Sequence, residues 1–452
     1  MKKSSYILFA VLAFSSCSND ETLNEQVNVN NEKTYTIDIN KRSYNEIVEI
    51  AQNSISILQD STSITRGNNT ARTLNLKNGI KAICQPSTRA NGGNDTLLYI
   101  VNFNDKKGFA VVSANRFTDG LIAVVESGEY DPNTPSGNPA LDICMESAAK
   151  YVASVEGKPE VKTRASSYYY MYKPQYDTLY YNKVEPKLKV KWGQNGYMSQ
   201  YCPNYYPCGC SNTAAAQIMS YFGWHYGFPK EMDLTYPGRN TNKISFMWDK
   251  IGLVAKTNDI YNLNYDQKAC LQIGQLARQL GYLSQTTYNQ SGSMTTDSKI
   301  RAALLKFKFK VGDLKNYKPY LTENGVVNSN AGLPLAGALS EGKLIYMAGS
   351  STDGEGHAWV VDGCYYVRAE QNFMGSNDGI HWYVDRKVAS YETSYNHINW
   401  GRDGYGDGYF NSWIFNANNA VSYDYSKGTN KSYYKNMKYF TVDIENKVLI
   451  RK

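Results

Sequence analysis

The chain has 452 residues, of which 42% are hydrophobic and 20% charged, and this composition excludes a chain that is mostly disordered. The formal net charge is only +7 and no dense basic tract occurs, so charge gives no indication of nucleic-acid binding. No stretch approaches the ~18 consecutive apolar residues of a membrane span, which excludes a polytopic membrane protein. At ~150 residues per domain, the length predicts two or three domains.

Residues 1–17 have the pattern of an export signal. A lysine pair precedes the apolar run Tyr6–Phe14, which is too short to cross a bilayer, and two serines then lead to Cys17. A Cys after small residues resembles the bacterial lipobox, so we predict lipidation at Cys17, with simple cleavage and secretion as the alternative. Residues 18–33 are polar, as in a tether, and contain no evident inner-membrane retention signal. We therefore expect an exported lipoprotein of the outer membrane, facing the periplasm or the outside.

Residues 34–157 predict a small α+β domain, because short apolar or alternating runs follow one another with turn residues between them. The expected elements are strands at 34–39, 97–103, 108–113 and 121–127, and helices at 44–58 and 139–155.

Residues 158–190 predict a linker, since prolines and basic residues are scattered through them. The bond after Arg164 lies in a polar context that suits maturation cleavage, although an ordinary loop arginine is the alternative. Of the eight cysteines, lipidation of Cys17 would leave an odd number, which in an exported protein suggests one free thiol. Spacing alone assigns no disulfide, and Cys202 with Cys208 is only a local option.

Residues 191–452 form the third region. Helices are expected near 266–281 and 298–308, and strands at 345–348, 357–362, 379–385 and 397–400.

Cys210 is the first candidate for chemistry. Gly209 can supply a sharp turn, and the Ala-rich segment after Ser211 favours a helix, so Cys210 would lie in the first helical turn. Free N–H groups and the helix dipole favour a thiolate there, as a cysteine nucleophile requires. Cys208 is the rival, and a structural cysteine at a helix cap is the alternative.

A nucleophilic cysteine needs a base, and the chain has four histidines. His357 opens an apolar run after a Gly-rich stretch, where a mobile loop enters a buried strand. Its separation from Cys210 agrees with the ~130–150 residues between Cys and His in papain-like enzymes. His225 is expected to pack among aromatic residues.

Two further groups complete the candidate site. Asn399 could accept the second imidazole N–H, and the adjacent indole of Trp400 could shield that bond from water. Gln194 could donate a side-chain N–H to an oxyanion beside the backbone N–H of Cys210. Each residue alone has an ordinary structural explanation, but their order along the chain is more specific together.

These motifs resemble the streptopain family of papain-like cysteine peptidases, over nearly all of the chain after the signal segment. The matching segments are Trp-Gly-Gln at 192–194, the Gly-Cys segment at 209–219, Gly-His-Ala at 356–363, His-x-Asn-Trp-Gly at 397–401 with 407–410, and, upstream, 102–103 and 108–115. The resemblance implies an α+β papain-like catalytic domain at 191–452, an inhibitory pro-domain at 34–157 that blocks the active site, and endopeptidase activity on proteins or peptides without a cofactor. It also implies that Cys210 is the nucleophile, His357 the base and acid, and Gln194 the oxyanion donor.

The chain departs from the family pattern at two places. Arg402 stands where the family has a second Trp near the catalytic His, which affects the assignment of the residue that supports the imidazole. Residues 368–395 look like a polar insertion that could form a loop over the cleft.

The leading hypothesis is a lipid-anchored cysteine endopeptidase made as a zymogen and cut by itself or by a trypsin-like partner. A cell-wall peptide amidase of related Cys-His fold and a non-catalytic surface binding lipoprotein are the alternatives. A zinc site from Cys202, Cys208, Cys210 and His225 has irregular spacing and is the weakest hypothesis.

Overall fold

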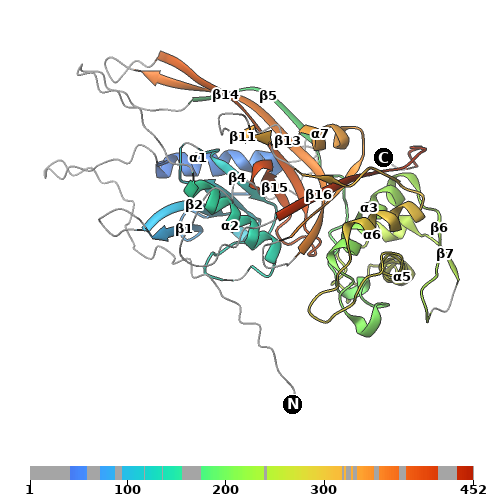
Figure 1. Cartoon of the computed structure of the whole chain (residues 1–452). Helices are drawn as coiled ribbons and strands as arrows, with labels where there is room; N and C mark the ends of the chain where they lie inside the picture. Colours follow the sequence, from blue (N-terminus) through green and yellow to red (C-terminus); the bar gives the residue numbers. More distant parts are fainter. Residues whose placement is uncertain are drawn as a thin grey trace.

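A single large antiparallel sheet organises the computed structural model (Figure 1). The structure describes residues 41–58, 72–86, 94–154 except 117 and 135, and 175–450 except 239–241, 318–319, 322–326, 329–332, 351–355, 376–382 and 416–434. Within these residues the sheet has 12 strands, ten of them in the order β1-β2-β3-β4-β15-β14-β13-β12-β16-β8, with β5 beside β13 and β9 beside β16.

The N-terminal part consists of four strands with one helix on each face. A capping box between Ser43 and Glu46 begins the first helix, and Ile47 and Ala51 bury its apolar face on the sheet. The second helix covers the opposite face. The elements are α1 (Tyr44–Ser54), β1 (Ile80–Pro86), β2 (Asn94–Asn102), β3 (Phe109–Ser113), β4 (Leu121–Val125) and α2 (Pro139–Ser154).

These elements confirm most of the predictions for residues 34–157. The helix predicted at 44–58 is α1 followed by a 3₁₀ turn to Leu58, and the strand pair predicted at 97–103 and 108–113 is β2 with β3. Strand β4 ends two residues earlier than predicted, and α2 matches its predicted span to within one residue. The strand predicted at 34–39 lies outside the described residues.

The C-terminal strands continue the same sheet. Strand β4 pairs antiparallel with β15, so that Val124 lies opposite Tyr409. Side chains of α2 share one core with Trp359 and Trp400 from the C-terminal part. The N-terminal and C-terminal parts are therefore joined by main-chain hydrogen bonds and by a common core. The long strands are β12 (Leu344–Ser350), β13 (Gly356–Gly375), β14 (Tyr383–Asn399), β15 (Gly408–Asn411) and β16 (Lys435–Asp443).

Two segments predicted as loops contain strands instead. The stretch 368–395 belongs largely to β13 and β14, which pair antiparallel along their length. The C-terminal half of the predicted linker holds β5 (Gln175–Val184), which pairs with the other side of β13. Residues 175–184 are rich in Tyr, Val and Thr, and in both segments residues of high β-propensity outweigh the polar character on which the loop predictions relied.

A group of helices packs on the sheet face opposite α2. Figure 1 shows α3, α5 and α6 grouped to the right of the strands, and their apolar faces share a core with Val360 and Phe440. The predictions of helices near 266–281 and 298–308 are confirmed. The helices are α3 (Cys210–Tyr226), α4 (Trp248–Ile251), α5 (Gln267–Leu283) and α6 (Asp297–Lys306), with α7 (Leu333–Ser340) near β5.

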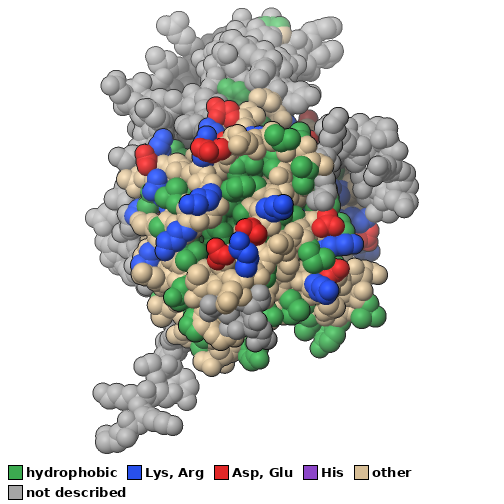
Figure 2. Space-filling view, turned by 90° about the vertical axis from the view of Figure 1, so that its right-hand side faces the viewer, with side chains coloured by type: hydrophobic (Ala, Val, Ile, Leu, Met, Phe, Trp, Pro, Cys, Tyr) green, Lys and Arg blue, Asp and Glu red, His purple; other side chains and the backbone are tan. Residues whose placement is uncertain are grey.

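The remaining strands are short. They are β6 (Glu231–Asp233), β7 (Lys243–Ser245), β8 (Lys310–Val311), β9 (Lys315–Asn316), β10 (Tyr320–Leu321) and β11 (Val327–Asn328). Figure 2 shows the side of the molecule that carries the helical group, where basic and acidic side chains alternate with apolar ones instead of gathering by sign. None of the helices in the described part of the chain is long and apolar enough to cross a membrane.

Candidate active site

Cys210 is the first residue of helix α3. Gly209 precedes it with φ of +95°, and a Cβ at that position would lie 2.8 Å from the carbonyl oxygen of Ser293, so only glycine fits this turn. The consecutive alanines 214–216 are fully buried and let the helix pack closely against its neighbours. The Cys210 thiol is half-buried and accepts a hydrogen bond from the backbone N–H of Ala358 on β13. This contact brings the cysteine next to His357.

Cys208 is in a different environment from Cys210. Its sulfur is fully buried and lies 3.1 Å from the Thr213 hydroxyl, and burial raises the pKa of this thiol well above its usual range. Cys208 is therefore unsuited to act as a nucleophile. Cys202 and Cys208 are both free thiols, so the local disulfide considered from their spacing is not formed.

His357 lies near the start of β13, next to two indole rings. Its ring centroid is 6.2 Å from that of Trp359 and 6.2 Å from that of Trp400, whose side chains are both fully buried. Its Nε2 is 2.9 Å from the main-chain oxygen of Trp400. A carbonyl oxygen only accepts, so Nε2 carries the proton in the neutral ring and Nδ1 remains free to act as a base.

The imidazole has a different partner from the predicted one. The Asn399 side chain is buried and does not bond the ring. Its oxygen accepts from Gln217 Nε2 and from the Gly401 N–H, each at 3.0 Å, and its nitrogen donates to the Val190 carbonyl at 3.1 Å. Asn399 therefore fixes the backbone at Trp400, and the Trp400 carbonyl in turn contacts His357. The predicted direct bond is absent because a main-chain oxygen occupies that place.

Gln194 is held close to the cysteine by main-chain bonding. Its carbonyl accepts a hydrogen bond from the N–H of Cys208 at 2.9 Å, two residues before Cys210. The half-buried Gln194 side chain makes no hydrogen bond to any other described residue, so its amide is free to donate to a bound group. The first N–H groups of α3 have no partner within the helix and point toward its N-terminal end, where Cys210 lies.

Burial keeps the candidate pair neutral in this structure. It raises the pKa of the Cys210 thiol, although the Ala358 and Ser211 hydrogen bonds and the charge of Arg402 act in the opposite direction. Burial and the charge of Arg402 lower the pKa of His357 to about 4. Burial therefore opposes the thiolate that we predicted for the start of the helix, and it opposes the imidazolium of His357 as well.

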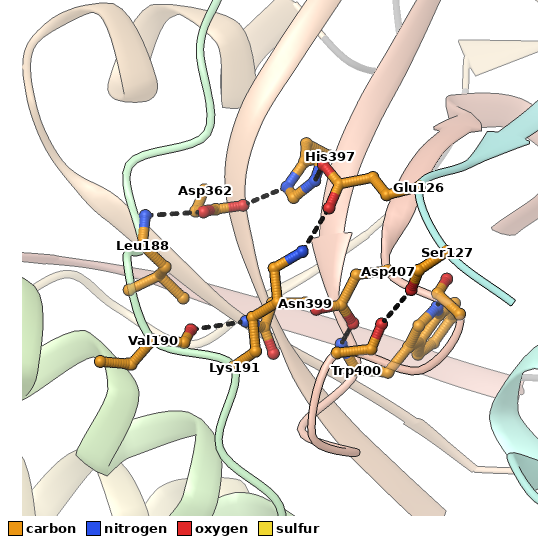
Figure 3. A network of polar contacts seen from close by, with 12 residues as sticks. Glu126, Ser127, Leu188, Val190, Lys191, Asp362, His397, Asn399, Trp400 and Asp407 are labelled. Atoms are coloured by element: carbon orange, nitrogen blue, oxygen red, sulfur yellow. Dashed lines mark hydrogen bonds and ion pairs between the residues drawn. The ribbon is translucent and has the colours of Figure 1, made fainter. Parts of the chain in front are cut away.

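A buried ionic network lies beside this site and links it to the N-terminal part (Figure 3). His397 Nδ1 is 2.6 Å from Asp362, and His397 Nε2 is 3.0 Å from Glu126, which directly follows β4. Glu126 also accepts from Lys191 Nζ at 2.5 Å. Burial alone would lower the pKa of His397, but the two carboxylates raise it to about 10. His397 and Lys191 in turn hold the pKa of Glu126 well below its usual range.

Contacts of the N-terminal part extend along the loop that follows Asn399. The Ser127 hydroxyl donates to the Gly404 carbonyl at 3.1 Å, and the Asn138 side chain donates to the Tyr405 carbonyl at 3.1 Å. Within the described residues, no hydrogen bond or ion pair connects this part to the side chains of Cys210 or His357. Its contacts are thus with the backbone loop that supports His357, and not with the reacting atoms.

Several residues of the site were not predicted from the sequence. Gln217 and Trp359 lie inside motifs that were recognised, and alternation along β13 places Trp359 on the same side as His357. The contacts of His397 and Glu126 join residues far apart in the chain, and no local pattern indicates them. His225 packs against Tyr221, as expected.

No metal centre is formed by the side chains that the structure describes, since no three His, Cys, Asp or Glu residues are arranged to hold an ion. The predicted positions of lipidation and maturation cleavage, Cys17 and Arg164, both lie outside the described residues.

We expect Asn399→Ala to lower the free energy of unfolding by about 1–3 kcal/mol, because it leaves buried groups of Gln217, Gly401 and Val190 without partners. Urea unfolding of the full chain measures this change. A variant with unchanged stability but a titration shift confined to His357 would instead indicate that Asn399 acts directly on the imidazole.

We expect alkylation of Cys210 by iodoacetamide in the unprocessed chain to be slow at pH 7 and to rise about tenfold per pH unit toward pH 9. The raised pKa of the thiol keeps the thiolate fraction small until the pH approaches it. Peptide mass mapping follows the label, with Cys210→Ala as control. A rate that is already at its plateau near pH 5 would contradict the neutral pair.

Comparison with known proteins agrees with this geometry. The family model described as the Peptidase C10 family matches residues 192–410, which include all of the candidate catalytic residues. Streptopain of Streptococcus pyogenes is 23% identical over 386 residues, covering 80% of this chain and 83% of streptopain. Two solved structures from Prevotella intermedia are also similar. A prointerpain A fragment has a TM-score of 0.46 at 18% identity, covering 79% of this chain and 97% of the fragment.

The second is active interpain A, with a TM-score of 0.36 at 20% identity, covering 57% of this chain and 94% of that one. The family match spans the cysteine, the histidine and the loop that supports it, and the streptopain match extends over the N-terminal part as well. Residues 192–410, which carry the candidate active site, therefore match the peptidase C10 family, and 80% of the chain is similar to streptopain.

Proposed function

We propose that the chain is the zymogen of an exported, lipid-anchored cysteine endopeptidase, with Cys210 as nucleophile and His357 as base and acid. The observation that carries this proposal is the position of Cys210. It begins a buried helix and accepts from the N–H of Ala358, the residue that follows His357. Few arrangements other than nucleophilic catalysis require a half-buried thiol, an available imidazole nitrogen and free N–H donors together.

The neutral pair sets the order of the first step. The Cys210 sulfur forms a bond to the peptide carbonyl carbon while its proton passes to Nδ1 of His357. Nε2–H remains bonded to the Trp400 carbonyl and orients the ring. The carbonyl oxygen becomes an oxyanion, which the Gln194 side chain and the Cys210 N–H stabilise.

The second half of the reaction returns the enzyme to its starting state. The imidazolium gives its proton to the leaving amine as the carbon–nitrogen bond breaks, and this leaves a thioester on Cys210. Water then attacks the thioester with His357 as base, and the acid product leaves with regeneration of the thiol. The indoles of Trp359 and Trp400 limit water around the ring during these transfers.

Residues 34–157 act in this proposal as an inhibitory pro-domain. Their contacts with the loop after Asn399 support inhibition through the backbone loop that contacts His357. Cleavage after Arg164 would leave β5 on the catalytic part, and this agrees with the pairing of β5 to β13. The enzyme itself or a trypsin-like protease makes the cut.

A maturation assay tests the proposal. We expect residues 18–452 to shorten on incubation under reducing conditions and to gain a label from a peptidase-directed thiol reagent at Cys210. Cys210→Ala and His357→Ala should stay whole, since neither retains the thiol and the base together. Intact mass spectrometry reads both changes.

Other results of the same assay are informative. Full protein cleavage by folded His357→Ala would contradict the assigned base, and cleavage of muropeptides without proteins would favour the amidase. A Cys210 that never labels after removal of the pro-domain would favour the binding lipoprotein. For the anchor, the full-length chain in bacterial cells should fractionate with membranes, and Cys17→Ser should not.

We expect Glu126→Gln to speed maturation roughly tenfold, because loss of the carboxylate leaves the half-buried Lys191 without its partner and weakens docking of the pro-domain. Time courses of chain shortening measure this rate. Glu129→Gln is the matched control, since Glu129 pairs with Lys106 of the pro-domain itself and is exposed.

The Glu126–Lys191 pair makes docking of the pro-domain depend on pH. The pKa of Glu126 is depressed in the docked state, so its contribution is present above the ordinary carboxyl range and is lost as the pH falls below it. Equal maturation rates for Glu126→Gln and the parent chain would show that the network does not hold the pro-domain.

A further inference from the structure

Arg402 lies in the loop between β14 and β15, at the edge of the candidate site. Two residues earlier, the Trp400 carbonyl contacts His357. Gly401 has φ of +71°, and a Cβ there would lie 3.2 Å from Thr213 in the first turn of the cysteine helix. Immediately after Arg402, Asp403 accepts from the Gly193 N–H at 3.2 Å, next to Gln194. The loop at Arg402 is therefore fixed against all three catalytic segments.

The charge of Arg402 has no counter-ion among the residues that the structure describes. Its Nε is buried without a hydrogen-bond partner, and its guanidinium forms no ion pair there. Asp403 is not available, because its oxygens accept from Gly193, Thr257 and Asn258. Asp407 accepts from the Trp400 N–H at 2.9 Å through one oxygen, its other oxygen has no hydrogen-bond partner, and no ion pair joins it to Arg402 among the described residues. A half-buried guanidinium with an unpaired Nε is costly to maintain and requires a reason.

The effect of Arg402 on the pKa values of Cys210 and His357 does not explain why an unpaired charge is kept at this place. The positive charge lowers the pKa of Cys210, which favours the thiolate, but it also lowers the pKa of His357, which disfavours the imidazolium. These two effects oppose each other in an ion pair. The charge is instead available for an anion that arrives with the substrate.

The position of Arg402 indicates which part of the substrate it meets. The leaving amine receives its proton from His357, so the residue that follows the scissile bond must lie on the histidine side of the site. Arg402 is on the same loop as the carbonyl that holds His357. It therefore lies nearer to the leaving half of the substrate than to the acyl half.

We infer that Arg402 forms a subsite for a carboxylate on the residue that follows the scissile bond. This inference rests on the proposed roles of Cys210 and His357. The carboxylate comes from an Asp or Glu side chain or from the free C-terminus of a peptide, because a guanidinium binds either one through two parallel hydrogen bonds. Arg402 is thus a specificity-determining residue of this chain, and not a residue that reacts.

Peptides that differ at one position test the inference. The enzyme is activated from the full chain and given internally quenched peptides with one cleavable bond. The residue that follows this bond is Glu, Gln or Lys. Two further peptides end at the residue that follows the cleavable bond, one as a free acid and the other as an amide. We expect kcat/KM to be about five- to tenfold higher for Glu than for Gln, or for the acid than for the amide, and lowest for Lys.

Variants separate the subsite from general effects on the enzyme. Arg402→Gln should bring the Glu-to-Gln ratio to about one, and because the ratio is taken within one enzyme it does not depend on the overall rate of that enzyme. Arg402→Lys should keep part of the preference because the charge remains. Lys268→Gln removes a charge from the exposed start of α5 and should keep the full ratio.

The outcomes distinguish this inference from the proposed function. Equal cleavage of the Glu and Gln peptides by the parent enzyme, together with equal cleavage of the acid and the amide, would overturn the subsite alone. A preference that survives in Arg402→Gln would also overturn it. A folded enzyme that cuts no peptide of the set would overturn the proposed function together with the subsite. A preference in only one pair supports the inference and identifies the source of the carboxylate.

Discussion

The buried amide of Gln217 connects the three segments on which the candidate site depends. Its oxygen accepts from the Trp192 N–H at 3.0 Å, and its nitrogen donates to the Asn399 oxygen at 3.0 Å. Gln217 itself lies on the helix that begins at Cys210. One side chain therefore fixes the distances among the oxyanion segment, the nucleophile and the loop that holds the base. Because the amide is fully buried, losing either bond would leave an unpaired polar group, and this makes the arrangement rigid.

Burial lowers the pKa of both His357 and His397, but the neighbouring charges give the two side chains opposite protonation states. His357 is flanked by indoles and faces a positive charge, so it is neutral at physiological pH. His397 is buried but lies between two carboxylates, so it is protonated. The same residue type thus provides a base on β13 and a fixed cation on the neighbouring strand β14. The charge of the neighbours decides the protonation state in each case.

Local sequence signals predicted the parts of the site that depend on local structure. Gly209 and the following alanines indicate a helix that starts at Cys210, and a glycine-rich approach to an apolar run indicates the strand of His357. The support of the imidazole could not be predicted in this way. Whether Asn399 or the Trp400 carbonyl meets the ring depends on how the loop folds onto α3, and that depends on contacts between residues far apart in the chain. The joining of β4 to β15 has the same origin, since strand register across distant segments is set by tertiary packing.

The pairing of β4 with β15 also determines what the mature enzyme would look like. In the full chain, β15 is an interior strand that pairs with β14 on one side and with β4 on the other. Removal of the N-terminal part, which carries β4, would convert Gly408–Asn411 into a sheet edge with free N–H and C=O groups. Such an edge can template the addition of another strand. The shortness of β15 limits this tendency, because a brief edge offers few main-chain bonds. Activation would therefore remove an internal strand pairing and expose an edge through which the processed form can self-associate. The solubility of the processed form would then differ from that of the full chain.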